Sequence, residues 1–199
     1  MFYTVAFLKK EKEMRYILAS KSPRRKELLS QITEDFEIIT KEVDEWLGFE
    51  AHPRTSVKYL AAMKGEAVAK DYPDAVVISS DTLVEVDGEA LGKPQDKNDA
   101  FNMLKKLSGR AHNVHTGVAV HYKGLSYSDV ATTAVFFRDL SDAEIIEYIE
   151  SGDPMDKAGS YGIQSGGGKF VDHIEGDYDT VVGLSVALTK RLINEATND

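Results

Sequence analysis

The chain has 199 residues and no cysteine, which excludes a disulfide framework, a thiolate zinc site and a cysteine nucleophile. Its formal net charge of −9 disfavours a surface for duplex nucleic acid, because phosphate contacts need clustered cations. No apolar run approaches the ~20 residues of a membrane span, and the short run at residues 2–8 lacks the basic leader of a signal peptide, so we expect a soluble cytoplasmic protein without a membrane partner.

Residues 1–13 join a short apolar run to a charged run and fit no element of a fold. Residues 16–19 are apolar and predict the first strand. Met14 lies just before this strand and is a candidate start of the natural chain. We therefore expect residues 1–13 to be a dispensable extension and residues 14–199 to form a single domain.

The segment after this strand predicts a helix that can bind an anion. Ser22 is a good N-cap, and Pro23 suits the first helical position because its missing N–H would have no partner there. Arg24 and Arg25 place two fixed positive charges beside the free N–H groups of the first turn. The segment predicts a phosphate site, and a capped surface helix with solvated arginines is the alternative.

A cluster of acidic residues follows a second strand-like stretch at 36–39. Glu42, Asp44 and Glu45 can supply oxygens to a Mg²⁺ ion that also binds phosphate. One or two carboxylates suffice, because Mg²⁺ keeps most of its waters. The cluster predicts a metal site, and an acidic surface loop is the alternative.

The third strand leads to a candidate catalytic carboxylate. Residues 75–79 form a short β-branched run that predicts a buried strand, and Asp81 follows it. Because ligands of α/β proteins gather beyond the carboxyl ends of strands, we expect Asp81 at a strand end that faces a cleft. A turn carboxylate is the alternative. A hairpin at 83–91 with an Asp-Gly turn then holds Lys93 in a stiff turn.

The remainder of the chain predicts further helices and a pair of antiparallel strands. Apolar residues at helical spacing, a capping box at 141–144 and strands joined through Lys123-Gly124 indicate one mixed sheet with helices. The expected elements are helices at 57–68, 98–107, 141–151 and 185–196, and strands at 114–122 and 131–137.

Glycines surround Tyr161 and Gln164 in the segment 156–168. Because glycine lacks a side chain, such a segment indicates a backbone that approaches a ligand closely. We expect this segment to form part of a binding site.

Several polar residues are interpreted as structural. His112, His115 and His121 are close in sequence, but their spacing matches no zinc motif. Asp177 and Asp179 lie in a glycine-bounded loop, where turn formation explains them. We assign no ligand to either group.

Motifs that follow one another over nearly the whole chain resemble those of the Maf family of nucleoside triphosphate pyrophosphatases. They include Ser80-Asp81-Thr82 and Gly92-Lys93-Pro94. The resemblance implies a mixed α/β fold, with an elongated, curved mixed β-sheet flanked by helices and two lobes around a central cleft, as in ITPase/Maf-like proteins. The matching segments lie at 18–29, 80–82, 92–94, 107–110, 156–164 and 176–184.

The resemblance also implies hydrolysis of a nucleoside triphosphate to the monophosphate and pyrophosphate. Asp81 is then the general base that orients or deprotonates water at the α-phosphorus, and Glu45 assists a divalent metal ion, Mg²⁺ or Mn²⁺. The other residues expected to bind the substrate or set its specificity are Ser20, Arg24, Arg25, Lys64, Thr82, Lys93 and Gln164.

Within the resemblance, Arg24, Thr82 and Gln164 match the subgroup that acts on dTTP and UTP rather than on 7-methyl-GTP. Gln164 can both donate and accept, so it can match the edge shared by uracil and thymine. We expect a nucleotide substrate of this class and a role in clearing surplus or modified nucleotides. The alternatives are a regulator of septum formation without essential catalysis and a phosphatase that releases the γ-phosphate, and a homodimer remains open.

Overall fold

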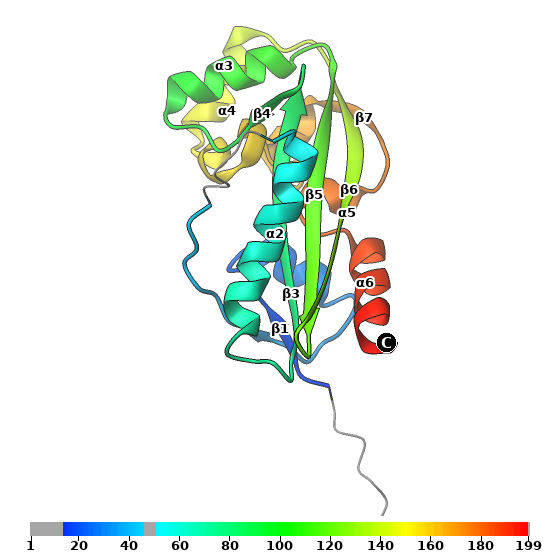
Figure 1. Cartoon of the computed structure of the whole chain (residues 1–199). Coiled ribbons are helices and arrows are strands. Elements are labelled where there is room, and N and C mark those ends of the chain that lie inside the picture. Colours follow the sequence, from blue (N-terminus) through cyan, green and yellow to red (C-terminus); the bar gives the residue numbers. More distant parts are fainter. Residues whose placement is uncertain (1–13, 46–50, 199) are drawn as a thin grey trace, which may run out of the picture.

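The computed structural model describes residues 14–45 and 51–198, so the expected extension at 1–13 lies outside the described residues. A seven-stranded mixed sheet forms the centre of the fold (Figure 1). Its strands are β1 (Tyr16–Leu18), β2 (Glu37–Ile38), β3 (Val76–Val86), β4 (Glu89–Leu91), β5 (Ala111–Tyr122), β6 (Leu125–Phe137) and β7 (Val171–Glu175).

The strand order is β2-β1-β3-β5-β6-β7, and β4 pairs with one end of β3. β1 runs parallel to both β2 and β3, whereas β3, β5, β6 and β7 pair antiparallel. The expected mixed sheet is confirmed. The β5–β6 turn passes through Lys123 and Gly124, both of which have positive φ angles.

Helices flank the sheet. The α-helices are α1 (Pro23–Leu29), α2 (Pro53–Ala69), α3 (Lys97–Leu107), α4 (Asp142–Glu150), α5 (Tyr178–Val182) and α6 (Val186–Asn198), and the short 3₁₀ helices are η1 (Asp153–Asp156), η2 (Ala158–Ser160) and η3 (Gly166–Phe170). In the part of the chain that the structure describes, no helix is both long enough and apolar enough to cross a membrane.

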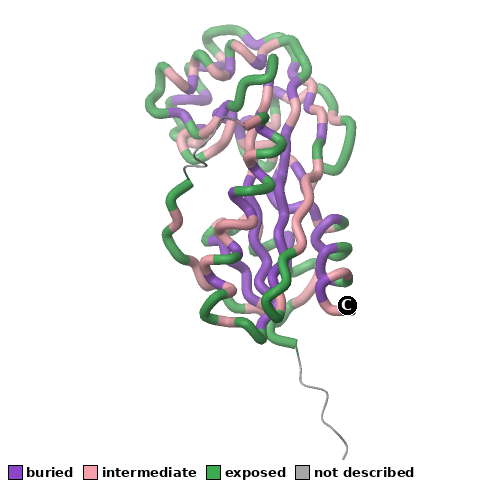
Figure 2. Tube along the Cα trace, in the orientation of Figure 1, coloured by how far each residue is buried: buried purple, intermediate pink, exposed green. Residues whose placement is uncertain are grey.

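Two separate hydrophobic clusters on one face of the sheet define two lobes. One cluster gathers α1, α5 and α6 around Val76 and Ile78 of β3. The other gathers α3, α4 and the 3₁₀ helices around Val84 and Val86, farther along the same strand. All four of these side chains are at even positions of β3, so they point to the same face of the sheet. The two lobes therefore lie one after the other along this strand. The central strands are buried over much of their length (Figure 2).

Helix α2 covers the opposite face, where it packs on β3 and β5. Gly117 of β5 allows a close approach, because a Cβ atom there would lie 2.2 Å from the backbone oxygen of Val57. Gly117 is the register partner of Asp81. The absence of a side chain at position 117 therefore brings α2 down onto the sheet beside this aspartate.

The prediction that Asp81 follows the end of a strand was wrong. β3 continues from Val76 to Val86, so Asp81 lies in its middle, and the predicted strand and first arm of the hairpin are one strand. The edge of β3 is nevertheless open there: β1 pairs with it as far as Ile78, and β4 pairs with it from Val84. A gap between two partners, rather than the end of the strand, exposes this aspartate.

The turn predicted around Asp177 and Asp179 was also wrong, because a short helix, α5, begins there. The Asp179 carboxylate accepts hydrogen bonds from the backbone N–H groups of Thr180 and Val186. It thereby supports the first turns of both α5 and α6.

Candidate active site

A cleft of about 850 Å³ lies between the two lobes, at the open edge of β3. Residues from both lobes line it, together with residues of α2. The residues expected to bind the substrate or set its specificity, the expected base and one of the three candidate metal ligands are among the lining residues: Ser20, Arg24, Arg25, Glu45, Lys64, Asp81, Thr82, Lys93 and Gln164.

The ammonium group of Lys64 joins the two candidate carboxylates. Its Nζ atom lies 2.6 Å from Asp81 Oδ1 and 2.9 Å from Glu45 Oε1. The Asp81 and Lys64 side chains are 11% and 20% exposed, whereas that of Glu45 is 59% exposed. A largely buried pair of opposite charges, Asp81 and Lys64, therefore lies in the cleft beside the more exposed carboxylate of Glu45.

The two-residue period of β3 sends neighbouring side chains to different faces. Asp81 points toward α2, where Lys64 meets it. Ser80 and Thr82 point toward the lobe of α1 and α5, and the Ser80 hydroxyl donates to the Gly183 oxygen at 2.8 Å. One strand thus supplies a charged group on one face and hydroxyls on the other.

Arg25 is anchored in the α1 lobe. Its guanidinium donates to the Gly183 oxygen at 3.0 Å and to the hydroxyls of Ser20 and Thr82 at 3.4 Å. Burial lowers the pKa of Arg25, against the nearby charge of Asp81, which raises it. Arginine stays charged at neutral pH in any protein environment.

A chain of hydroxyls continues from this arginine. Thr116 donates to the Thr180 oxygen at 2.7 Å, so its hydroxyl accepts from Thr82 at 3.0 Å. Thr82 in turn accepts from Arg25. Thr82 therefore orients the guanidinium of Arg25 in this structure.

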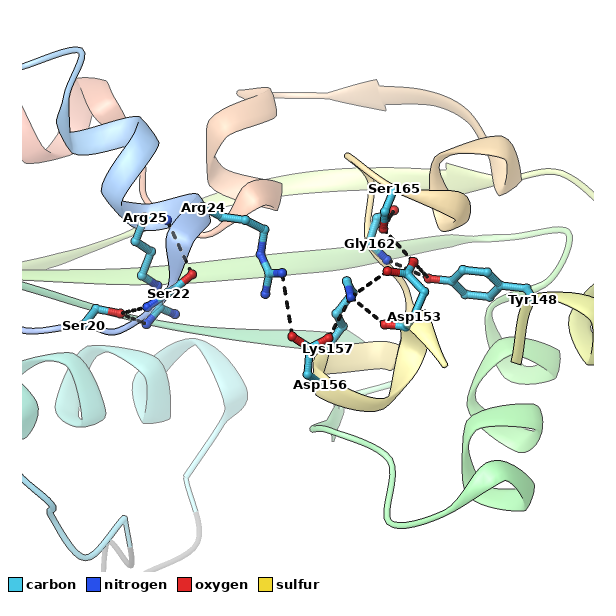
Figure 3. A network of polar contacts seen from close by, with 10 residues as sticks. All are labelled: Ser20, Ser22, Arg24, Arg25, Tyr148, Asp153, Asp156, Lys157, Gly162 and Ser165. Carbon is cyan, nitrogen blue, oxygen red and sulfur yellow. Dashed lines mark hydrogen bonds and ion pairs between the residues drawn. The ribbon is translucent and has the colours of Figure 1, made fainter. Parts of the chain in front are cut away.

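Arg24 is held much less firmly. Its Nη1 atom lies 3.9 Å from Asp156 Oδ2, across the cleft in the other lobe (Figure 3). At this distance between partly exposed groups, the ion pair contributes little to stability. The guanidinium is therefore available to an anion that enters the cleft.

The N-cap that presents these arginines agrees with the prediction. The Ser22 side chain accepts from the Arg25 backbone N–H at 3.4 Å, and Pro23 opens α1. Lys93, which follows β4, is exposed and lines the cleft. Cations from both lobes thus face the same space.

Of the three carboxylates that the sequence proposed as metal ligands after β2, Glu45 lines the cleft and Glu42 and Asp44 do not. Glu45 and Asp81 fit a divalent cation, because both already approach one positive charge, the Lys64 ammonium. Two carboxylates together with substrate phosphates match the way proteins bind Mg²⁺. No group of three or more metal-binding side chains occurs within 14–45 and 51–198.

The sequence reasoning missed a second polar cluster on the cleft wall. Lys157 bonds to Asp153 Oδ1 at 2.9 Å and Asp156 Oδ1 at 2.7 Å, and its side chain is 11% exposed. The sequence analysis includes Asp156 and Lys157 in the matching segment 156–164 but assigns no role to either residue. A signal was present in the sequence: an acidic and a basic residue, Asp156 and Lys157, stand side by side in a glycine-rich segment. Such a pair can form ion pairs that hold a loop in place.

Two of the three neighbouring histidines make hydrogen bonds within the sheet and its packing. His115 lies 2.9 Å from Glu85 and 2.8 Å from the Thr132 hydroxyl. His112 lies 2.8 Å from the Tyr161 hydroxyl, and its ring meets Phe137 edge-on. These contacts belong to the packing of the sheet.

His112 makes stability depend on pH. Burial, helped by the charge of Arg110, lowers its pKa from 6.5 to about 4. Between these values the unfolded chain binds the proton more tightly, so stability is fully present above pH 6.5 and is lost as pH falls toward 4. We expect a loss of up to about 3 kcal/mol in urea unfolding over this range. His112→Gln, which does not titrate, should lack this part of the slope, and an unchanged slope would contradict the assignment.

Comparisons with known proteins agree with the site. The family described as "Maf-like protein" matches residues 15–196. The dTTP/UTP pyrophosphatase of Bacillus velezensis is 48% identical over 181 residues, which cover 91% of this chain and 96% of that protein. The dTTP/UTP pyrophosphatase of Bacillus mycoides is 45% identical over 183 residues, which cover 92% and 96%.

The fold has a more distant solved neighbour. A HAM1 protein from Coxiella burnetii superposes with a TM-score of 0.50 at 13% identity, covering 92% of this chain and 100% of that chain. This likeness concerns the fold alone. The family match over residues 15–196, nearly all of the described chain, shows that this protein belongs to the Maf family.

Proposed function

We propose that this protein hydrolyses dTTP and UTP to the nucleoside monophosphate and pyrophosphate. The observation that carries the proposal is Asp81, a carboxylate at the open edge of β3 in a cleft that receives Arg24, Lys64 and Lys93 from different parts of the chain. Attack on a polyphosphate needs cations around the phosphates and a base near the attacking water, and this cleft offers both. The names of the Bacillus relatives support the same activity.

In this proposal, the role of each residue follows from its place in the cleft. Arg24 and Arg25 at the start of α1 bind phosphate oxygens, with the N–H groups of the first helical turn beside them. Lys93 approaches from the other lobe. Asp81 orients the water and accepts its proton, and its neighbour Lys64 keeps a positive charge next to the carboxylate.

A divalent metal ion, Mg²⁺ or Mn²⁺, would be held by Glu45 and Asp81. When bound, the ion would supply positive charge that offsets the negative charge of the phosphates as pyrophosphate leaves. The chain's own cations hold the substrate in place.

Gln164 faces the base end of the cleft in this proposal. Its amide can donate to O4 and accept from N3–H of uracil or thymine. A base that cannot pair with the amide would leave a polar group unsatisfied, at a cost of ~1–3 kcal/mol.

We also propose that the enzyme works in the cytoplasm on nucleotide pools and that it can form a homodimer.

A panel of nucleoside triphosphates with chromatographic identification of products tests the proposal. We expect dTTP and UTP to be consumed faster than ATP, GTP and 7-methyl-GTP. Pyrophosphate should be the inorganic product, with orthophosphate appearing after an inorganic pyrophosphatase is added. Direct release of orthophosphate would favour a γ-phosphatase, and binding without turnover would favour a regulator.

A further inference from the structure

Gln164 lies inside a tight turn that lines the cleft. The turn is closed by the Ser165 N–H, which donates to the Gly162 oxygen at 3.2 Å. Among the described residues, the Gln164 amide has no hydrogen-bond partner, so the protein orients it through the backbone of the turn. Whatever holds this turn therefore determines where the amide meets a ligand.

Both ends of the turn are tied to one pair of side chains, Tyr148 of α4 and Asp153 of η1. The Tyr148 hydroxyl accepts from the Gly162 N–H at 3.2 Å and donates to Asp153 Oδ2 at 2.7 Å. At the other end, the Ser165 hydroxyl donates to the same Oδ2 atom at 2.6 Å. Figure 3 shows these contacts converging on one carboxylate.

Lys157 completes the support beneath the turn. Its Nζ atom lies 2.9 Å from Asp153 Oδ1. Although burial raises the pKa of Asp153, hydrogen bonds from Ser165, Tyr148 and Lys157 hold it below its ordinary value. The lysine stem also lies against Gly162, where a Cβ atom would be 2.6 Å from its Cε. Asp153 is therefore a charged acceptor shared by three donors.

The hydrogen bonds of Tyr148 and Ser165 are separate from the packing of the core. Tyr148 already packs its ring in the core, edge-on to Phe170, and Ser165 is exposed. Their hydroxyls link the turn to Asp153 of η1. Two hydroxyls from opposite sides of the turn meet one oxygen, which fixes the turn's position and angle together.

We propose that Tyr148, Asp153 and Ser165 are positioning residues that set base discrimination by holding the Gln164 turn. The inference rests on the proposed function. A firmly held turn keeps the amide at one distance and angle from the base, so that a wrong base leaves it unpaired. A loosened turn lets the amide follow the edge of cytosine or a purine, and discrimination falls.

The test compares Tyr148→Phe and Ser165→Ala, which each remove one hydroxyl and little else. Matched controls are Tyr122→Phe and Ser126→Ala, near the far β5–β6 turn. For each protein we would measure kcat and KM for dTTP, dCTP and dATP, and the melting temperature. We expect the preference for dTTP over dCTP to fall roughly three- to tenfold in each test variant, the loss expected from about one hydrogen bond. The effect should appear as a higher KM for dTTP with kcat largely kept.

The outcomes separate three cases. A preference that both test variants and both controls keep would overturn the inference while leaving the proposed function intact, even if the melting temperature falls. A wild-type enzyme that hydrolyses neither dTTP nor UTP would overturn the proposed function and the inference with it. Should Tyr148→Phe fold poorly, Ser165→Ala decides alone, because position 165 is exposed.

Discussion

Replacing Asp81 with asparagine is expected to lower kcat for dTTP by roughly 10²–10⁴-fold, the usual contribution of a positioned general base. The amide keeps the shape of the carboxylate but loses its charge and its basicity. Lys64 keeps Glu45 as a partner at 2.9 Å, so we expect little change in melting temperature. Steady-state kinetics and thermal unfolding of the same preparation check both parts.

Asp87→Asn is the matched control for this change. Asp87 lies in the turn after β3, has a φ of 56° that asparagine tolerates, and pairs with Arg110. It is not among the residues that line the cleft. Its loss should leave kcat unchanged. Near-full activity of Asp81→Asn, or an equal loss of kcat in Asp87→Asn, would show that Asp81 is not the general base.

Arg24→Ala and Arg25→Ala should both weaken the use of dTTP but differ in stability. Under the proposed function, each change removes charged hydrogen bonds to phosphate, worth about 1.5–3 kcal/mol. We therefore expect kcat/KM to fall roughly 10- to 150-fold, with KM rising as well. Arg24 contacts Asp156 at 3.9 Å, so its loss should leave the melting temperature unchanged. Arg25 also binds Ser20, Thr82 and the Gly183 oxygen, so the loss of Arg25 should lower the melting temperature.

Arg191→Ala on α6 is the control for both arginine changes. Arg191 pairs with Asp129 and Glu195 at the surface and does not line the cleft. Its removal should change neither KM nor kcat by more than a small factor. Equal melting temperatures for the two α1 variants would show that the contacts of Arg25 do not stabilise the lobe.

Local patterns in the sequence predicted much of the framework. The Ser22 N-cap and the Ser141–Glu144 capping box are both formed, because a cap depends on residues within one helical turn. The β5–β6 hairpin was located from Lys123-Gly124, although both strands are longer than expected. Polar residues near the start of β6 concealed its length, because this half of the strand is exposed or half-buried and shows no apolar run.

By itself the sequence determined which residues carry charge, where α1 and α4 begin, and the family to which the order of its motifs belongs. It did not place the start of α2, which begins at Pro53 rather than at residue 57, and it missed α5. The tertiary structure alone decided how those residues meet. Asp81 faces a cleft because β1 ends and β4 begins on the same edge of β3, and Lys64 reaches it because Gly117 lets α2 lie close to the sheet. The Tyr148–Asp153 support of the Gln164 turn was likewise invisible. Such contacts join elements distant in the chain, and their geometry comes from sheet register and packing, which no local spacing of residues encodes.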